Sequence, residues 1–441
     1  MSSDAIDSCL GAIIAEGQAE LQTGPFGTML KAEEYSSEGA PVVSVGEIRE
    51  GYLEIGRKTP RVSDETIARL PRFLLRQNDI VFGRKGSTHR NALIKKGEEG
   101  FFLGSDGIRL RVNSESICPK YLSYQLRSAR AVSWLKANSE GTTMPSLNQD
   151  ILSRFPITLL PVAEQKAIAH ILGTLDDKIE LNRKTNETLE AMAKALFKSW
   201  FVDFDPVRAK AEGRPTGLPA EISDLFPDSF EDSELGEIPS GWRDGEIQDV
   251  AELNPETWGS RNQPLSVRYL DLSNVKHGKI DSVEEYQWED APSRARRILK
   301  TGDTVVGTVR PGNGSYCLIG EDGITGSTGF AVLRPKNKND SAFVYLGSCS
   351  KENIDRLAHL ADGGAYPAVR PELVAQTPVI IAARDLLDCF SRSVSPLFAA
   401  AEERKRSSKL LCQARDALLP KLISGEIRIP DVEKMLEEVG V

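Results

Sequence analysis

The sequence predicts an α/β protein in which two similar, β-rich domains stand in a pseudo-two-fold arrangement, separated by two long antiparallel helices of the coiled-coil type. Three observations favour this fold: an internal repeat with a period close to 222 residues, an unbroken heptad pattern, and a second heptad pattern at the same offset. The length of 441 residues also favours more than one domain, because single cores rarely grow so large.

The repeat consists of short segments that keep their order and spacing. Residues 75–83 resemble residues 299–307, and each segment predicts a turn that carries an aspartate, a short strand and a glycine-containing loop. Residues 141–147 share their glycine and proline pattern with residues 363–369, which lie 222 positions later. Several such matches in order indicate two copies of one domain.

A heptad pattern of alternate four- and three-residue steps follows the first copy, and it predicts a long helix packed along another helix. The first pattern is Ile168, Leu172, Leu175, Ile179, Asn182, Asn186, Leu189, Ala193, Leu196 and Trp200. The same offset gives a second pattern, which is Phe390, Val394, Leu397, Ala401, Arg404, Ser408, Leu411, Arg415, Leu418 and Leu422.

Antiparallel pairing with residue 168 opposite residue 422 places Asn182 against Ser408 and Asn186 against Arg404. A buried polar layer of this kind costs stability but specifies register, so we expect it to fix the pairing of the helices. The predicted helix-pairing residues are Leu172, Leu175, Ile179, Asn182, Asn186, Leu189, Leu196, Leu397, Arg404, Ser408, Leu411 and Leu418.

Proline placement predicts an irregular second helix. Pro396 and Pro420 fall inside its pattern, so we expect it to start late or to kink, and to end near Leu419. A helix of about 35–40 residues is roughly 50–60 Å long. That length exceeds one DNA turn of about 34–36 Å, so two domains on such a spacer would suit a split DNA site.

Composition predicts a cytoplasmic protein that does not associate with membranes. No apolar run approaches the roughly 18–20 residues of a membrane span, and the N-terminus has no secretion signal. The six cysteines are scattered and predict reduced thiols. The net charge of −9 opposes nucleic-acid binding, but basic clusters at 72–96 and 294–310 and an acidic stretch at 221–237 show that charge is distributed unevenly.

These patterns divide the chain into six segments. They are a first domain at 1–160, a first long helix at 161–203, an acidic linker at 204–240, a second domain at 241–381, a second long helix at 382–428 and a C-terminal tail at 429–441.

Four sequence blocks resemble type I restriction–modification specificity subunits, over about residues 5–428. They are Gly-Pro-Phe-Gly at 24–27, the block at 159–179 that contains Pro-x-x-Glu-Gln and opens the first helix, Phe-Lys-Ser-Trp-Phe-Val-Asp-Phe-Asp-Pro at 197–206 and Ser-Glu-Leu-Gly-Glu-Ile-Pro-x-Gly-Trp at 233–242. The second helix departs from the pattern, because residues 382–385 are Ala-Ala-Arg-Asp.

The resemblance implies a DNA-recognition subunit without catalytic residues. Each domain would read one half of a bipartite site in double-stranded DNA, and the helices would set the spacer and dock two modification subunits. Those methyltransferase subunits would carry the S-adenosylmethionine, so no cofactor is expected on this chain. Restriction subunits would join them in the full complex.

DNA bases are read by short polar, Arg or Lys side chains on loops that enter the grooves. The loop at 83–90 and its counterpart at 307–316 carry different side chains on similar frames, as expected for readers of different half-sites, although each can equally be an ordinary surface loop. The turns at 141–146 and 363–367 are second candidates. The predicted DNA-binding residues, with Arg84, Lys85 and Arg310 foremost, are Arg84, Lys85, Ser87, Thr88, Arg90, Thr142, Thr143, Thr308, Arg310, Asn313, Ser315, Tyr316 and Tyr366.

Two other functions compete with DNA reading, a methyltransferase or nuclease and a protein scaffold. A methyltransferase that acts on amino groups needs an Asn/Asp-Pro-Pro-aromatic loop, and the nearest strings, at 205–207 and 254–256, lack the second proline and the aromatic residue. The four histidines show no metal-ligand spacing, so no metal site is predicted. A scaffold that binds proteins stays open, and salt dependence separates it from a phosphate-binding protein.

Overall fold

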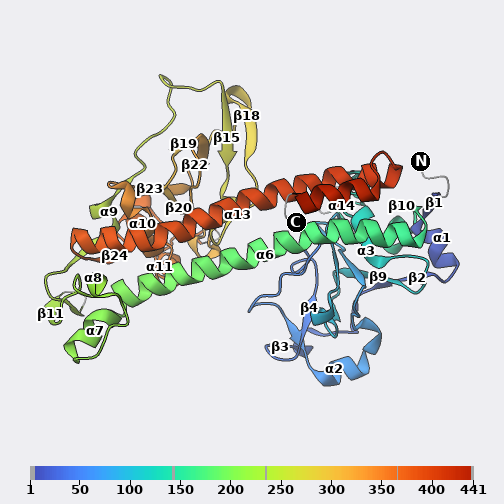
Figure 1. The fold of residues 1–441 in the computed structure, drawn as a ribbon, viewed down its shortest axis with the longest axis horizontal. Helices are drawn as coiled ribbons and strands as arrows, with labels where there is room; N and C mark the ends of the chain where they lie inside the picture. Colours follow the sequence, from blue (N-terminus) through green and yellow to red (C-terminus); the bar gives the residue numbers. More distant parts are fainter. Residues whose placement is uncertain (1–4, 142–144, 234–235, 365, 439–441) are drawn as a thin grey trace. The chain divides into compact units, whose positions relative to one another are not determined.

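The computed structural model describes residues 5–141, 145–233, 236–364 and 366–438. The chain forms two compact units, which we call unit 1 (Met1–Asn182 with Arg406–Val441) and unit 2 (Arg183–Lys405). Each unit holds a globular part and a portion of each of two long helices, α6 (Val162–Phe201) and α13 (Arg384–Ser424) (Figure 1).

The described globular part of unit 1 combines short strands with short helices. Its strands are β1 (Ile6–Cys9), β2 (Ala19–Thr23), β3 (Tyr35–Ser36), β4 (Ala40–Val43), β5 (Arg61–Val62), β6 (Ile80–Gly83), β7 (Asn91–Leu93), β8 (Phe102–Leu103), β9 (Gly107–Val112) and β10 (Pro156–Leu159). Its helices and 3₁₀ turns are α1 (Leu10–Ala15), η1 (Ala32–Glu34), α2 (Asp64–Arg69), η2 (Pro71–Phe73), η3 (Lys96–Glu98), α3 (Pro119–Gln125), α4 (Ala129–Asn138), α5 (Gln149–Ser153) and α14 (Ile429–Glu438).

Unit 2 has the same kind of composition over its described residues. Its strands are β11 (Phe230–Ser233), β12 (Gly236–Pro239), β13 (Arg243–Glu246), β14 (Ala251–Leu253), β15 (Ser266–Leu270), β16 (Val275–Lys276), β17 (Lys279–Ile280), β18 (Glu284–Gln287), β19 (Ala295–Leu299), β20 (Thr304–Gly307), β21 (Tyr316–Leu318), β22 (Ile324–Ser327), β23 (Phe330–Pro335) and β24 (Pro378–Ile381). Its helices and 3₁₀ turns are α7 (Asp205–Ala211), α8 (Ala220–Ser223), α9 (Ile247–Val250), η4 (Leu272–Asn274), η5 (Trp288–Asp290), η6 (Pro311–Asn313), η7 (Lys338–Asp340), α10 (Ser341–Ser348), α11 (Lys351–His359) and α12 (Pro371–Ala375).

The two units share their strand topology, which confirms the predicted duplication. An antiparallel sheet of order β2-β9-β6-β7 in unit 1 corresponds to β14-β23-β20-β21 in unit 2. A second sheet in each unit contains one parallel pair, β4 with β8 in unit 1 and β15 with β22 in unit 2. The strand before each long helix, β10 or β24, pairs with an early strand of its own unit, β1 or β13.

The predicted Asp-bearing turn of unit 1 is built around a buried ion pair. Asn78 has a left-handed φ of 72°, which asparagine tolerates better than most residues, and it turns the chain into β6. The carboxylate of Asp79 accepts a hydrogen bond from the backbone N–H of Arg76 at 2.7 Å and pairs with Arg111 of β9 at 2.7 Å. The aspartate therefore ties the turn to the sheet.

Unit 2 repeats this arrangement with glycine at the turn. Gly302 has a φ of 91°, and Asp303 accepts from the N–H of Lys300 at 2.8 Å and pairs with Arg334 of β23 at 2.8 Å. Both turns need a residue that tolerates a left-handed φ, followed by an aspartate that pairs with an arginine of the sheet. This shared need explains the matching sequence blocks.

In unit 1, the two long helices lie side by side and antiparallel. Ile168 and Leu172 of α6 share one buried cluster with Leu419 and Leu422 of α13. At the end of this contact, Asn182 donates a hydrogen bond to the Ser408 hydroxyl at 3.2 Å.

In unit 2, aromatic packing joins the other portions of the same helices. The ring of Phe390 in α13 lies 5.7 Å from that of Trp200 and 5.0 Å from that of Phe201 in α6. The expected pair of Asn186 with Arg404 does not form: the buried Asn186 Oδ1 has no hydrogen-bond partner, and Arg404 donates to the Ala400 carbonyl of its own helix at 3.0 Å. The long arginine side chain reaches its own backbone instead.

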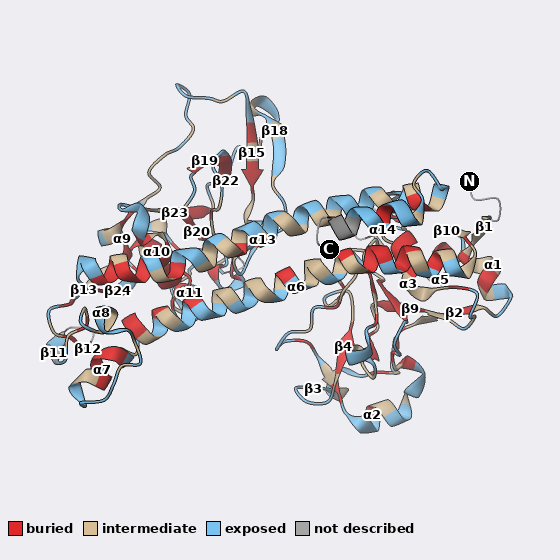
Figure 2. Ribbon diagram, in the orientation of Figure 1, coloured by how far each residue is buried: buried red, intermediate tan, exposed pale blue. Residues whose placement is uncertain are grey.

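Along α6 and α13, buried and partly buried residues alternate with exposed ones (Figure 2), and the remaining predicted helix-pairing residues are not among the exposed ones. Leu175 is buried, and the partly buried ones are Ile179, Leu189, Leu196, Leu397, Leu411 and Leu418.

The predicted late start of the second helix and its predicted end near Leu419 are wrong. Helical structure continues in α13 from Arg384 to Ser424, through both Pro396 and Pro420. An interior proline removes one backbone hydrogen bond at a cost of about 3 kcal/mol. Burial of Val394 beside Pro396 and of Leu419 and Leu422 around Pro420 offsets this cost, since packing overrides propensity.

The glutamine at the start of α6 fixes the helix to the globular part of unit 1. The buried Gln165 side chain donates to the carbonyls of Leu160 at 2.7 Å and Ser116 at 3.0 Å, and it accepts from the N–H of Cys118 at 2.8 Å. Its three hydrogen bonds explain why the Pro-x-x-Glu-Gln block carries an amide here.

The start of α13 uses a different interaction for the same purpose. Arg384 donates to both carboxylate oxygens of the buried Asp340 at 2.9 and 2.6 Å. A bidentate ion pair therefore holds the helix where the glutamine block is absent.

Two segments that were expected to be a linker and a tail are folded. Residues 204–240 hold α7, α8 and the β11–β12 hairpin, and Phe204, Val207 and Phe226 are buried in the core of unit 2. Residues 429–438 form α14, with Val432 buried. Exposed acidic side chains give the first segment its linker-like composition, whereas its few apolar residues anchor it.

Candidate nucleic-acid interface

In unit 1 the two predicted DNA-reading loops lie together. We call residues 83–90 together with residues 139–141 and 145–147 the first loop pair. The N–H of Gly86 donates to the Pro145 carbonyl at 2.8 Å, and the N–H of Leu147 donates to the Arg84 carbonyl at 2.8 Å. These hydrogen bonds hold two segments that are far apart in the sequence in one rigid frame.

Unit 2 places its two candidate loops in the same way. We call residues 307–316 together with residues 362–364 and 366–369 the second loop pair. The N–H of Arg310 donates to the Pro367 carbonyl at 2.7 Å, and the N–H of Val369 donates to the Thr308 carbonyl at 2.9 Å. The donors and acceptors occupy the repeat-equivalent positions of the first loop pair.

The side chains of the first loop pair give it a cationic surface. Lys85 is exposed and lies 3.3 Å from the carboxylate of Asp106. Arg84, Ser87 and Arg90 are half-buried. An ion pair this exposed stabilises little, so Lys85 can exchange its partner for a phosphate.

The second loop pair presents an arginine stacked on an aromatic ring. The Arg310 guanidinium lies 4.8 Å from the ring centroid of Tyr366, which is 72% exposed. Arg310 has a left-handed φ of 47°, whereas glycine, Gly86, stands at the equivalent position of unit 1. A non-glycine residue in this region is strained by about 1–2 kcal/mol, and such strain is found most often at functional sites. Asn313 is exposed and Ser315 is half-buried on the same loop.

Three of the predicted contact residues belong to the framework of the loops. Thr88 is buried and its hydroxyl lies 2.8 Å from that of Ser139. Thr308 is buried and donates to the Gly329 carbonyl at 2.8 Å. Tyr316 is buried in β21, where burial raises its pKa to about 12. The polar side chains of these three residues suggested that they are exposed. Each lies inside its unit instead, where it forms a hydrogen bond with a neighbouring group or packs against its neighbours. Thr142 and Thr143 lie outside the described residues.

Two side chains that the sequence prediction missed lie with Arg84. Arg72 and Phe26 line one pocket with it in unit 1. Arg72 opens the basic cluster at 72–96, and Phe26 belongs to the Gly-Pro-Phe-Gly block, so both signals were present without any indication that the residues meet.

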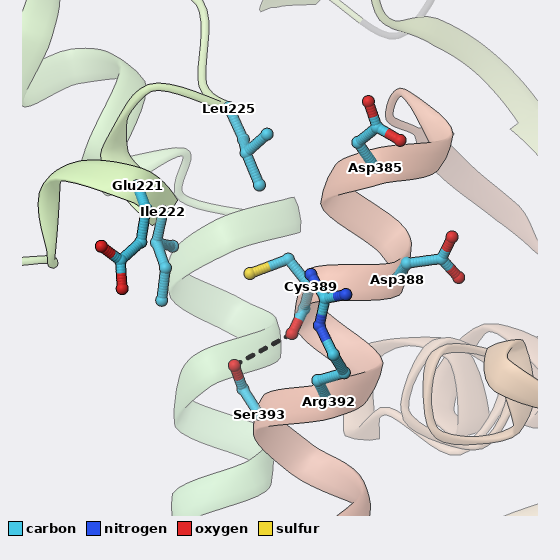
Figure 3. Close-up of a pocket in the computed structure, with 8 residues that line it drawn as sticks. All are labelled: Glu221, Ile222, Leu225, Asp385, Asp388, Cys389, Arg392 and Ser393. Atoms are coloured by element: carbon cyan, nitrogen blue, oxygen red, sulfur yellow. Dashed lines mark hydrogen bonds between the residues drawn. The ribbon is translucent and has the colours of Figure 1, made fainter.

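A pocket of unit 2 has the opposite character (Figure 3). It lies beside the first turns of α13, and carboxylates of Glu221, Asp385 and Asp388 line it with Arg392. Arg384 lowers the pKa of Asp388, so this carboxyl stays ionised at neutral pH. The negative charge opposes binding of DNA phosphates here.

Among the described residues, His, Cys, Asp and Glu form no group that could hold a metal ion. Burial raises the pKa of the Cys317 thiol to about 12 and raises that of Cys349 as well, so neither is a nucleophile at neutral pH. No helix in the described part of the chain is long and apolar enough to span a membrane.

The comparisons with known proteins agree with this geometry. A family model described as the type I restriction modification DNA specificity domain matches residues 21–191. The type I restriction enzyme HindI specificity subunit of Haemophilus influenzae is 25% identical over 410 residues, covering 80% of this chain and 87% of the relative. The match to the family model thus covers the first part of the chain, and the similarity to type I specificity subunits extends over most of it.

Further similar proteins cover almost the whole length of this chain. The MjaVIII specificity subunit of Methanocaldococcus jannaschii is 23% identical over 412 residues, covering 89% of this chain and 90% of the relative. A crystal structure of the type I restriction–modification S subunit from M. genitalium has a TM-score of 0.50 at 16% identity, covering 96% of this chain and 97% of that one. This last likeness concerns the fold.

Proposed function

We propose that this chain is a type I specificity subunit that reads a bipartite site in double-stranded DNA, with one loop pair for each half of the site. The observation that carries the proposal is the common backbone frame of the two loop pairs, in which N–H groups of Gly86 and Arg310 donate to the carbonyls of Pro145 and Pro367. A shared frame with different side chains suits two readers of different base sequences, because base edges are distinguished by side-chain donors and acceptors.

Within each frame, the exposed residues supply the chemistry of recognition. Lys85 in the first loop pair suits phosphate or guanine acceptors, and Arg310 stacked on Tyr366 in the second suits guanine, since a guanidinium can bind guanine O6 and N7 together. We assign the half-buried Arg84, Ser87, Arg90 and Ser315 and the exposed Asn313 to supporting contacts.

The long helices would set the unread spacer and dock two modification subunits. The 40 residues of α6 and 41 of α13 support this role, because a helix of that length spans roughly 60 Å. S-adenosylmethionine would be held by the modification subunits, and restriction subunits would complete the complex.

The test is methylation mapping in cells that express the chain with its modification subunit. We expect methylated adenines in a split motif with a fixed gap, and we expect exchange of residues 241–380 for those of a relative to change only one half of it. A contiguous motif, or exchange that alters both halves, would contradict the proposal. Binding that hardly weakens from 50 to 200 mM salt would favour a protein-binding scaffold instead.

A further inference from the structure

A pocket of unit 1 beside the first loop pair gathers positive charge that no carboxylate compensates. Arg72 and Arg84 both line it, and its lining includes no acidic residue. Arg84 has no hydrogen bond or ion pair through its guanidinium among the described residues, whereas Arg72 lies over the Phe73 ring at 4.8 Å and its Nη2 lies 3.6 Å from the sulfur of Met29. Two guanidinium groups without counter-charges attract an anion into the pocket.

The rest of the pocket offers polar groups and one exposed ring. Gln149 donates to the Thr23 hydroxyl at 2.8 Å, which orders both side chains on the wall. Gly24 sits so close to the Gly104 carbonyl that a Cβ would stand 1.8 Å from its oxygen, so glycine is required there. This tight turn leaves Phe26 61% exposed at the rim.

Unit 2 does not carry the same pair of cations. Thr308 stands at the position equivalent to Arg84, and its hydroxyl is engaged by the Gly329 carbonyl. Arg296 stands at the position equivalent to Arg72, and it lies over the ring of Trp288 at 4.6 Å. The paired cations are therefore a property of unit 1 and not of the repeated frame.

We propose that Arg72 and Arg84 form a phosphate clamp, which binds one phosphodiester of the DNA backbone next to the half-site read by the first loop pair. The inference rests on the proposed function and deepens it. Phosphate contacts fix the register of a protein on the duplex without reading its sequence, so the clamp would position Lys85 against the bases. A second source of the same chemistry is free phosphate, and the experiment separates the two.

The test measures DNA binding by the complex of the full chain with its modification subunit. Duplexes that contain the mapped site carry a single uncharged methylphosphonate linkage, moved one position at a time. One position should weaken binding by the wild type but not by the Arg72→Ala/Arg84→Ala variant. The variant should also flatten the salt dependence: between 50 and 200 mM salt, loss of one phosphate contact removes a factor of about 3.5 from the fall in affinity. Arg57→Ala, an exposed arginine of the same unit outside the pocket, is the matched control and should behave as the wild type.

Three results would overturn the clamp. The first is that no position of the methylphosphonate changes the affinity for DNA. The second is that the variant changes which adenines are methylated, which would make Arg84 a base reader. The third is that the variant abolishes binding of inorganic phosphate while its binding of DNA is unchanged. If the wild-type complex itself methylates no split motif, the proposed function fails. If it does and the variant binds every duplex as the wild type does, only the clamp fails.

Discussion

Asp176 of α6 is the residue whose replacement tests how unit 1 holds its helices. Its carboxylate pairs with Arg415 of α13 at 2.7 Å and with Arg127 at 3.2 Å, and it accepts a hydrogen bond from the Tyr124 hydroxyl at 2.9 Å. The side chains of Arg415 and Arg127 are only 15% and 11% exposed. Asp176→Asn would leave Arg127 without its ion-pair partner, and Arg415 would keep only the more exposed Asp416, at 2.8 Å.

We expect this substitution to destabilise the helix contact by about 2–4 kcal/mol, somewhat below the 3–5 kcal/mol typical of a broken buried ion pair, because Asp176 is 26% exposed. Hydrogen exchange of peptides from α6 and α13 measures the loss of stability at the helix contact itself. A local measurement is needed because a chain with two units need not unfold in a single step. Asp177→Asn is the matched control, since Asp177 is exposed on the same helix. Equal exchange in the two variants would refute the reasoning.

The same network predicts a pH dependence with a definite sign. Burial alone raises the pKa of Asp176, but the charges of Arg127 and Arg415 outweigh it, and the net shift is downward. A carboxyl with a lowered pKa stabilises the folded state above its unfolded pKa, near about 3.9, and loses that contribution as the pH falls further. The difference in stability between wild type and Asp176→Asn should therefore be full at pH 7 and shrink below about pH 4.

Three further substitutions probe the core, the register and the interface. Trp200→Ala should destabilise unit 2 by about 3–5 kcal/mol in urea denaturation, because a buried ring 5.7 Å from Phe390 is lost; a loss under 1 kcal/mol would contradict its core role. Asn182→Leu combined with Ser408→Leu should stabilise the helix contact yet permit other registers of α6 against α13. Spin labels on the two helices should then show several distances, and a single unchanged distance would argue against a register role. Arg310→Gly should keep the stability within about 1 kcal/mol of the wild type, because glycine adopts the left-handed φ without strain. It should weaken methylation at sites that contain the half-site read by the second loop pair. Full methylation would show that Arg310 is not part of the interface.

Several features of the fold were predictable because their causes are local or periodic. The heptad patterns identified both long helices, and the matching Asp79 and Asp303 turns revealed the duplication. The bounds of the second helix were not predictable from Pro396 and Pro420, since packing by neighbouring apolar residues, which no local rule contains, outweighs the lost hydrogen bonds.

The candidate interface was predicted at the level of loops and not of side chains. Both loops of each pair were singled out, but residue type did not separate the exposed Lys85 and Arg310 from the buried Thr88 and Thr308, because polarity says nothing about which hydroxyls satisfy the interior. The pocket with Arg72 was missed for the same reason.

By itself, the sequence determined that the chain is duplicated, that two long helices pair antiparallel, and which segments carry chemistry suited to DNA. Only the tertiary structure decided that loops some fifty residues apart in the sequence share one frame, that Arg310 is held in a left-handed conformation, and that Arg72 and Arg84 line one pocket. The physical reason is that periodicity is written along the chain, whereas close approach depends on long-range backbone hydrogen bonds and packing that form when each unit folds.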